Sequence, residues 1–193
     1  MNRIDVASLM SLETYAKARP EYRARVLAHK KERTVALGPN VTLIFEDELT
    51  IRYQIQEMLR IEKTFEEQGI LDELEAYTPL VPDGGNWKAT MLIEFPEAAE
   101  RKRRLAEMRG IEHQVRVEVG GTSVMAVADE DMDRSNAEKT SAVHFLRFEL
   151  PADLRVALRD GADLALAIDH PAYQARSRIV DPIRMSLLGD FSG

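Results

Sequence analysis

Residues 41–69, VTLIFEDELTIRYQIQEMLRIEKTFEEQG, decide the fold class of this chain. The apolar segment 41–46 is typical of a β-strand, and Asp47 directly after it is a preferred N-cap residue for a helix. We expect that helix to run to about Gln68 and to end at Gly69. Its apolar stripe would be Ile51, Ile55, Met58, Leu59 and Phe65. A strand that passes directly into a long helix indicates a fold that mixes both kinds of element.

Other segments extend this pattern on both sides. Residues 87–95 alternate between apolar and polar, and 142–150 are apolar on both faces, which predicts a strand in the interior of a sheet. Residues 113–119 and 122–128 flank Gly120-Gly121, which is typical of a hairpin turn, and His113 is expected on the apolar face of this hairpin. A further strand is expected at 164–169, and helices at about 20–33, 71–77, 97–109, 151–161 and in the tail.

These elements predict one α+β domain covering residues 1–193, with helices packed around a mixed or mostly antiparallel sheet of about six strands. The segment 78–86, TPLVPDGGN, is the strongest break in the pattern and is expected to be a loop within that domain. Residues 129–141 are acidic and polar and are expected to form an exposed loop.

Composition excludes several classes of function. The chain has 193 residues and no cysteine, which removes disulfides, thiolate nucleophiles and cysteine-ligated metal clusters. Its net charge of −7 disfavours nucleic-acid binding, and the run at 101–104 is flanked by glutamates, which favours a solvated helix face. Without a membrane-length apolar run or a secretory signal pattern, the sequence predicts a cytoplasmic protein. The glycine spacings match neither a Rossmann fingerprint nor a P-loop.

A metal site is the sharpest chemical hypothesis that remains. His144 on a strand, His170 at a strand end and a carboxylate of the long helix, Glu57 or Glu62, would form a two-histidine, one-carboxylate set suited to iron, manganese or zinc. The simpler interpretation is that each histidine is hydrogen-bonded within the core and that the glutamates pair with arginines.

A small-ligand site is the second hypothesis. Tyr53, Glu57 and Arg60 share one face of the long helix, where Arg60 would bind an anion, although Glu57 and Arg60 could simply pair with each other. Tyr173, three residues after His170, would line a pocket at a strand end or pack on the sheet.

Five segments in the same order resemble the uncharacterised bacterial family DUF3501. They are SLETYAKARPEYRARVLAHKKERTVALGPNVTLIFED (11–47), YQIQEMLRIEK (53–63), LEAYTPLVPDGGNWKATMLIEF (74–95), AVHFLRFEL (142–150) and IDHPAY (168–173). The resemblance implies no assigned activity, but it implies genetic proximity to rubrerythrin-like proteins and iron–sulfur oxidoreductases, and so a role near iron or peroxide metabolism. The best-matching segments add Gln54 and Glu94 to the ligand candidates.

Two functions are therefore expected from the sequence. The first is an accessory protein of a redox or iron-related system that binds a metal or small ligand. The alternative is a non-catalytic module that docks a partner, or a second copy as a homodimer, through its charged helices at 20–33 and 97–109. No motif decides whether the protein is an enzyme.

Overall fold

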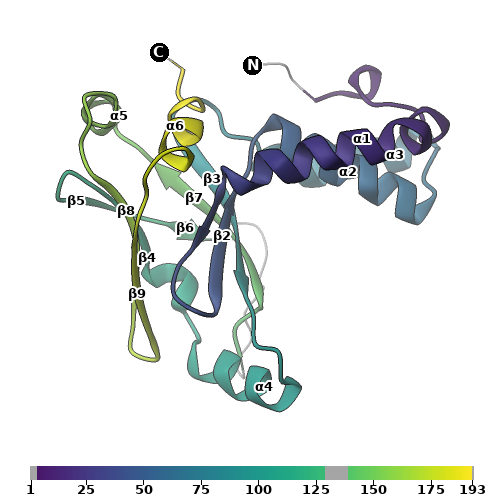
Figure 1. Ribbon diagram of the computed structural model, residues 1–193. Coiled ribbons are helices and arrows are strands. Elements are labelled where there is room, and N and C mark those ends of the chain that lie inside the picture. The colour runs from purple at the N-terminus through teal and green to yellow at the C-terminus, as the bar shows by residue number, and fades with distance from the viewer. Residues whose placement is uncertain (1–3, 129–138, 193) are drawn as a thin grey trace.

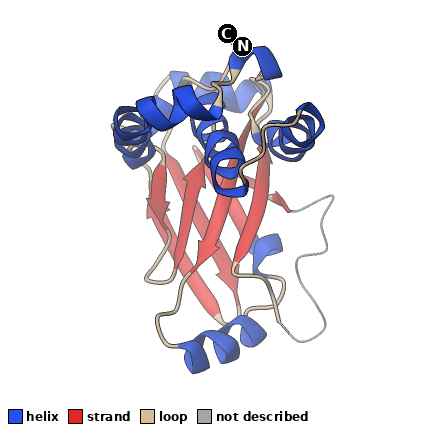
Figure 2. Cartoon of the chain, turned by 90° about the vertical axis from the view of Figure 1, so that its right-hand side faces the viewer, coloured by secondary structure: helices blue, strands red, loops and turns tan. Residues whose placement is uncertain are grey.

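Two antiparallel sheets form the body of the molecule in the computed structural model, which describes residues 4–128 and 139–192 (Figures 1 and 2). The first sheet has the order β1 (Thr34–Ala36), β2 (Val41–Phe45), β3 (Asn86–Ile93), β7 (Val143–Glu149) and β6 (Val127–Ala128). The second has the order β5 (Thr122–Met125), β4 (Val115–Val119), β8 (Leu164–His170) and β9 (Tyr173–Arg178). The α+β class is confirmed, and both sheets are antiparallel throughout.

The two sheets share one hydrophobic core and are joined along both edges. On one side the chain passes from β5 to β6 through Ala126, whose N–H still bonds to the carbonyl of Val115 at 2.9 Å. On the other side Tyr173 of β9 donates its hydroxyl to the carbonyl of Leu37 at 2.7 Å. The core between them includes Phe45, Trp87, Phe148, Val117 and Leu166. Burial of these side chains against one another is the main stabilising contribution to the body.

The strongest local predictions are confirmed. Strand β2 alternates buried and half-buried residues, and β7 lies between β3 and β6, the interior position that its two apolar faces predict. The hairpin around Gly120-Gly121 forms, with Val119 opposite Thr122 and Val117 opposite Val124. Its expected second strand, 122–128, divides at Ala126 into β5 and β6, which belong to different sheets. The prediction for His113 is wrong, because it lies exposed in the short 3-10 helix η3 (Ile111–Gln114) before the strand begins.

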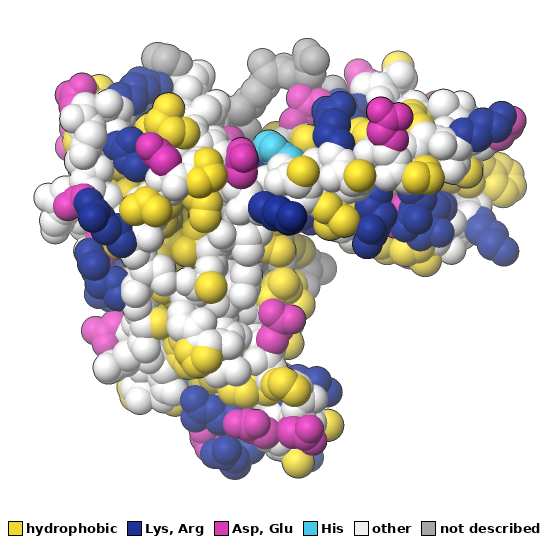
Figure 3. All heavy atoms as spheres, in the orientation of Figure 1, with side chains coloured by type: hydrophobic (Ala, Val, Ile, Leu, Met, Phe, Trp, Pro, Cys, Tyr) yellow, Lys and Arg dark blue, Asp and Glu magenta, His cyan; other side chains and the backbone are white. Residues whose placement is uncertain are grey.

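Three helices form an arm that projects from the body (Figures 1 and 3). They are α1 (Leu12–Lys31), α2 (Glu48–Glu62) and α3 (Glu67–Tyr77), preceded by the 3-10 helix η1 (Val6–Ser8). The arm has a hydrophobic cluster of its own, built on Ile51, Ile55, Leu59 and Leu74. Asp47 is the N-cap of α2, as predicted, and accepts a hydrogen bond from the N–H of Thr50 at 2.9 Å.

Two helix boundaries differ from those predicted. Helix α1 begins after Ser11 and carries Pro20 inside it, because the buried Tyr15 and Val26 on either side pack the helix firmly enough to offset the missing N–H. Helix α2 ends at Glu62, where Lys63 adopts a left-handed conformation, and Gly69 lies within α3 rather than at a helix end. Phe65, assigned to the apolar stripe, is therefore exposed.

The remaining helices lie at the two ends of the body. Helix α4 (Ala98–Glu107) lies at the end opposite the arm, and α5 (Ala152–Arg159) and α6 (Ile183–Leu188) lie at the arm's end (Figure 1). The segment 78–86 contains the 3-10 helix η2 (Thr78–Leu80). Most of the loop expected at 129–141 lies outside the described residues. In the part of the chain that the structure describes, no helix is both long enough and apolar enough to cross a bilayer.

Candidate functional site: a groove where the arm meets the body

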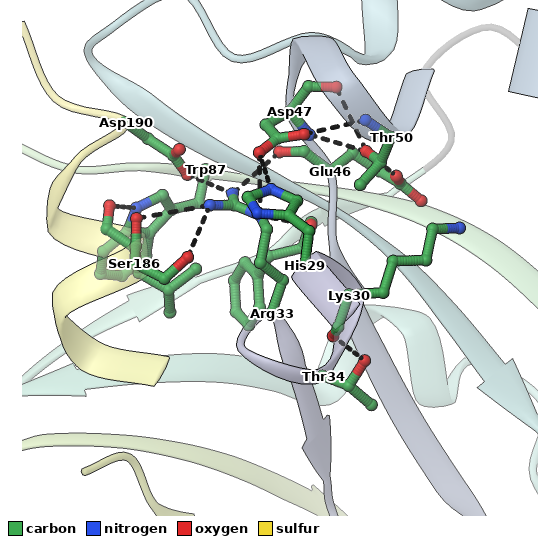
Figure 4. Close-up of polar contacts among 12 residues, drawn as sticks. His29, Lys30, Arg33, Thr34, Glu46, Asp47, Thr50, Trp87, Ser186 and Asp190 are labelled. Atoms are coloured by element: carbon green, nitrogen blue, oxygen red, sulfur yellow. Dashed lines mark hydrogen bonds and ion pairs between the residues drawn. The ribbon is translucent and has the colours of Figure 1, made fainter. Parts of the chain in front are cut away.

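Arg33 is the centre of a buried polar network at the joint between the arm and the body (Figure 4). It follows α1 directly and is only 1% exposed. Its Nε donates to the carbonyl of Phe45 at 2.9 Å, and its Nη2 donates to the carbonyl of Glu46 at 3.1 Å and to the Asp190 carboxylate at 2.6 Å. Its Nη1 donates to the carbonyl and hydroxyl of Ser186, each at 3.3 Å. One guanidinium thus connects α1, the end of β2 and α6.

Two carboxylates compensate the buried charge of Arg33, as burial of a guanidinium requires. Besides Asp190, the Oδ2 atom of Asp47 lies 3.5 Å from the Nε of Arg33. Burial raises the pKa of Asp190 above its usual value, although Arg33 acts in the opposite direction. Burial acts on Asp47 in the same way, but Arg33, the Thr50 N–H and His29 together outweigh it and hold the pKa of Asp47 below its usual value. Asp47 is therefore ionised near neutral pH, and Asp190 takes up a proton more readily on acidification.

His29 and Asp47 form a close pair beside this arginine. The Nε2 of His29 lies 2.5 Å from the Oδ2 of Asp47, and the two side chains point toward each other (Figure 4). Because an ionised carboxylate can only accept, Nε2 of His29 is the donor in this contact. In the described residues Nδ1 makes no hydrogen bond with the protein.

A groove of about 640 Å³ lies alongside this network. Asp47 and Asp190 are part of its wall, and Tyr22 and Arg25 of α1 and Arg52 of α2 contribute polar side chains. Its apolar surface comes from Met10, Leu49, Val81 and Pro82. The groove therefore combines contributions from the arm, the loop after η2 and the C-terminal turn.

Tyr22 is the one groove residue with an unsatisfied buried hydroxyl among the described residues. Its ring is fixed between Tyr15 and Tyr53, with centroid distances of 6.1 Å to each. Burial raises the pKa of Tyr22, so the hydroxyl stays protonated and can donate. An unpaired buried hydroxyl costs roughly 1–3 kcal/mol, which an acceptor in the groove would recover.

Arg25 lies over the ring of Tyr22 and has no carboxylate partner within the described residues. Its guanidinium carbon lies 5.8 Å from the centroid of the Tyr22 ring. Arg52 differs, because it pairs with Glu48 at 2.5 Å and donates to the carbonyl of Ser8 at 2.7 Å. The groove lining therefore includes two donors from α1, three positions apart in sequence, one neutral and one cationic.

The sequence-predicted ligand residues do not lie together. Tyr53, Gln54, Glu57 and Arg60 are on α2, whereas Glu94 follows β3 of the first sheet and Tyr173 begins β9 of the second, where both contact Asn40. Arg60 donates to Glu57 at 3.2 Å, as the simpler interpretation expected. Arg19 also makes a two-point contact to Glu57 at 2.8 Å, and the Tyr15 hydroxyl donates to it at 2.6 Å. Glu57 thus ties α1 to α2 and has its acceptor positions filled.

The predicted metal ligands are also dispersed. His144 is buried in β7 against Thr140 at 2.9 Å and the carbonyl of Ser141 at 3.1 Å. His170, in the other sheet, is held by the carbonyl of Arg109 and the N–H of Ala172. Glu62 is exposed on α2. Across residues 4–128 and 139–192, no group of three or more histidine, aspartate or glutamate side chains could hold a metal ion.

The groove residues were missed for identifiable reasons. Tyr22 and Arg25 lie three positions apart on one face of the helix expected at 20–33, but from the sequence that helix is expected only as a charged docking surface. Asp47 was assigned only a capping role. No local pattern connects Arg33 with Asp190.

Comparisons with known proteins agree with this structure without adding an activity. A crystal structure of a novel protein of unknown function from Burkholderia pseudomallei K96243 is 51% identical in sequence, with a TM-score of 0.94, over 99% of this chain and 100% of that chain. No curated protein matches the chain. The family model described as "Protein of unknown function (DUF3501)" matches residues 3–191, nearly the whole sequence, and the chain therefore belongs to the DUF3501 family.

Proposed function

We propose that this protein binds a small acidic molecule, a carboxylate or phosphate compound, in the groove between the arm and the body. The single observation that carries the proposal is that the groove lining contains the unsatisfied Tyr22 hydroxyl together with Arg25, which lies over the Tyr22 ring and lacks a carboxylate partner in the described residues. Both groups donate hydrogen bonds, and a charged donor beside a neutral one favours an anionic acceptor.

The ion pairs around the groove, rather than its net charge, support an anion as the ligand. Arg52 pairs with Glu48, and the buried Arg33 has two carboxylates, Asp47 and Asp190, so that with Arg25 three cations and three carboxylates balance at the groove. Arg25 is the lining cation that makes no ion pair with the described residues. The apolar residues of the groove, Met10 and Leu49 among them, would contact the hydrocarbon part of the ligand.

We therefore propose the small-ligand site expected from the sequence near the start of the long helix rather than at Arg60. The described residues contain no group of side chains arranged to hold a metal ion, so the metal-binding hypothesis has no structural support there. Rubrerythrin-like and iron–sulfur partners, and a redox or iron-related role, stay predictions from the family resemblance.

Thermal-shift and calorimetric titrations of the full chain test the proposal. The probes are inorganic phosphate, pyrophosphate, citrate and succinate, with Fe²⁺, Mn²⁺ and Zn²⁺ as a separate arm. A ligand at about 100 times its Kd stabilises the fold by about 2.7 kcal/mol, a readily measured shift. We expect Tyr22→Phe and Arg25→Gln each to weaken anion binding about tenfold.

Arg23→Gln is the matched control, because Arg23 is an exposed cation on the same helix that does not line the groove. Anion binding that is insensitive to Tyr22→Phe and Arg25→Gln would contradict the proposal. If only a metal ion stabilises the protein, the result would favour the metal-binding hypothesis from the sequence and contradict the proposed anion site.

A further inference from the structure

The outer end of the arm exposes large apolar side chains. Phe65, in the connection between α2 and α3, is 76% exposed, Ile61 at the end of α2 is 60% exposed, and Leu71 of α3 is 43% exposed. Figure 3 shows apolar side chains along the projecting arm, away from the sheets. Single exposed apolar residues are common, but several gathered on a projection indicate a contact surface.

The connection that carries Phe65 is a defined corner. Lys63 ends α2 with a φ of 55°, a left-handed conformation that costs free energy for a residue other than glycine. A Cβ on Gly69 would lie only 2.5 Å from Cγ2 of Thr64, so the close approach of α3 to this corner requires glycine. The exposure of Phe65 therefore follows from a specific local structure.

The same end of the arm is strongly acidic. Residues 62–75 contain six carboxylates and one lysine, a net charge of −5 out of −7 for the chain. Glu73 shows the resulting repulsion: burial raises its pKa, and the nearby Glu62 and Asp72 raise it further. Its Oε2 is buried without a hydrogen bond among the described residues. A cationic surface placed here would relieve that repulsion.

The complementary surface lies on the same protein at α4. Residues 98–109 contain five cations and two carboxylates, and the exposed Lys102 makes no ion pair with the described residues. Arg103 and Arg104 share the single carboxylate of Glu107. Helix α4 and the arm lie at opposite ends of the body, so the two surfaces of one molecule stay apart (Figures 1 and 2).

We propose that the acidic, apolar arm tip of one copy docks on the basic helix α4 of a second copy. The two surfaces differ, so this contact is heterologous, and each molecule keeps one arm tip and one α4 for further neighbours. Attraction between opposite charges orients the two copies, and burial of Phe65 and Ile61 supplies the apolar contribution. The contact is independent of the proposed ligand, because neither surface includes groove residues.

Sedimentation velocity on the full chain tests this inference. At low ionic strength we expect the weight-average mass to rise with protein concentration. About 0.5 M NaCl should reverse much of that rise, because the screening length falls from about 30 Å at 0.01 M salt to about 3 Å at 1 M. Phe65→Ser and the double variant Lys102→Glu/Arg103→Glu should each abolish association. Arg23→Glu, which reverses an exposed cation outside both surfaces, should leave association unchanged.

Mixing the two defective variants gives the decisive result. The Phe65→Ser chain keeps an intact α4, and the Lys102→Glu/Arg103→Glu chain keeps an intact arm tip, so their mixture should form a one-to-one dimer and nothing larger. A monomeric wild-type chain up to about 1 mM at low salt would overturn the inference, since it excludes even weak association. A mixture that stays monomeric, or variants that associate as the wild type does, would overturn it equally.

Discussion

Arg33 and Asp190 are separated by 157 positions in the chain, and their side chains meet at 2.6 Å. Both are largely buried, with 2% and 9% of their side-chain surfaces exposed. This ion pair brings the C-terminal turn against the end of α1, and Asp190 then forms part of the groove wall. The last residues of the sequence are therefore part of the candidate site rather than an appendage to it.

Removal of the Asp190 carboxylate should destabilise the whole molecule. Asp190→Ala leaves Arg33 with Asp47 as its one acidic neighbour, and we expect the free energy of unfolding at neutral pH to fall by about 3 kcal/mol. Urea denaturation measures this difference. Asp153→Ala, on the exposed first turn of α5, should change it by less than about 0.5 kcal/mol. Equal effects of the two substitutions would refute the assigned role of Asp190.

Two substitutions at Asp47 should separate its capping role from its charge. Asp47→Ser keeps a side-chain oxygen for the Thr50 N–H but loses the contacts to His29 and Arg33, whereas Asp47→Ala loses all three. We expect Asp47→Ala to be less stable than Asp47→Ser by about 1 kcal/mol, the usual value of an N-cap. Both should be less stable than the wild type by about 2 kcal/mol or more. Chemical denaturation gives all three values, and wild-type stability in Asp47→Ser would show that the charge contributes nothing.

The Glu57 contacts should make the stability of the arm depend on pH. Hydrogen bonds from Arg19, opposed by burial and supported by Tyr15 and Arg60, lower the pKa of Glu57 from 4.5 to about 2. A carboxyl whose pKa is lower in the folded state stabilises the fold above its unfolded pKa and loses that contribution as pH falls toward the folded pKa. We therefore expect Glu57→Gln to cost about 2 kcal/mol at pH 7, and the difference from wild type to shrink between about pH 4.5 and pH 2.

Unfolding measured at pH 7 and again near pH 3 checks the Glu57 prediction. Glu13→Gln is a suitable control, because Glu13 pairs with Lys17 while both side chains are largely exposed. A Glu57→Gln penalty that is constant with pH would be inconsistent with a lowered pKa.

Gly69→Ala should destabilise the arm even though alanine favours helices and Gly69 lies within α3. The new Cβ would meet Cγ2 of Thr64 at 2.5 Å, and a β-branched side chain cannot rotate away freely. We expect a loss of about 1 kcal/mol. Thr64→Ser removes the clashing methyl group, so the double variant should recover this loss and gain from the higher helix propensity of alanine. Thermal unfolding of the wild type, the two single variants and the double variant measures the coupling free energy between positions 64 and 69. If the effects of the two substitutions simply add, there is no clash between these side chains.

Local sequence patterns predicted the parts of the fold that depend on neighbouring residues. The Gly120-Gly121 hairpin and its register follow from turn geometry, and the interior position of β7 follows from its two apolar faces. Strands β1 and β9 were not predicted from the sequence. Strand β1 is only three residues long, and β9 is rich in polar and charged residues because one of its faces is exposed. Pro20 and Gly69 predict helix ends, but both lie inside helices, because tertiary packing outweighs their usual local preferences.

The candidate site was less accessible to sequence analysis, because its charges are paired across the fold. Glu57 and Arg60 attract attention as neighbours on one helix face, yet they are part of the arm's structural contacts. The histidines at 144 and 170 are paired within their own surroundings. In the described residues Tyr22 lacks a hydrogen-bond partner for its hydroxyl and Arg25 lacks a carboxylate partner. Such a missing partner can be recognised only when the fold is known.

The separate hydrophobic cluster of the arm has a consequence for how the molecule opens. Helices α2 and α3 bury their apolar residues mainly against each other and α1, while the joint to the body is made of directional polar contacts. The arm is thus a cooperative unit that can unravel while the sheets stay intact. Backbone amides of α3 should exchange with deuterium well before those of β3 and β7, and a bound anion spanning the joint would slow the arm's exchange selectively.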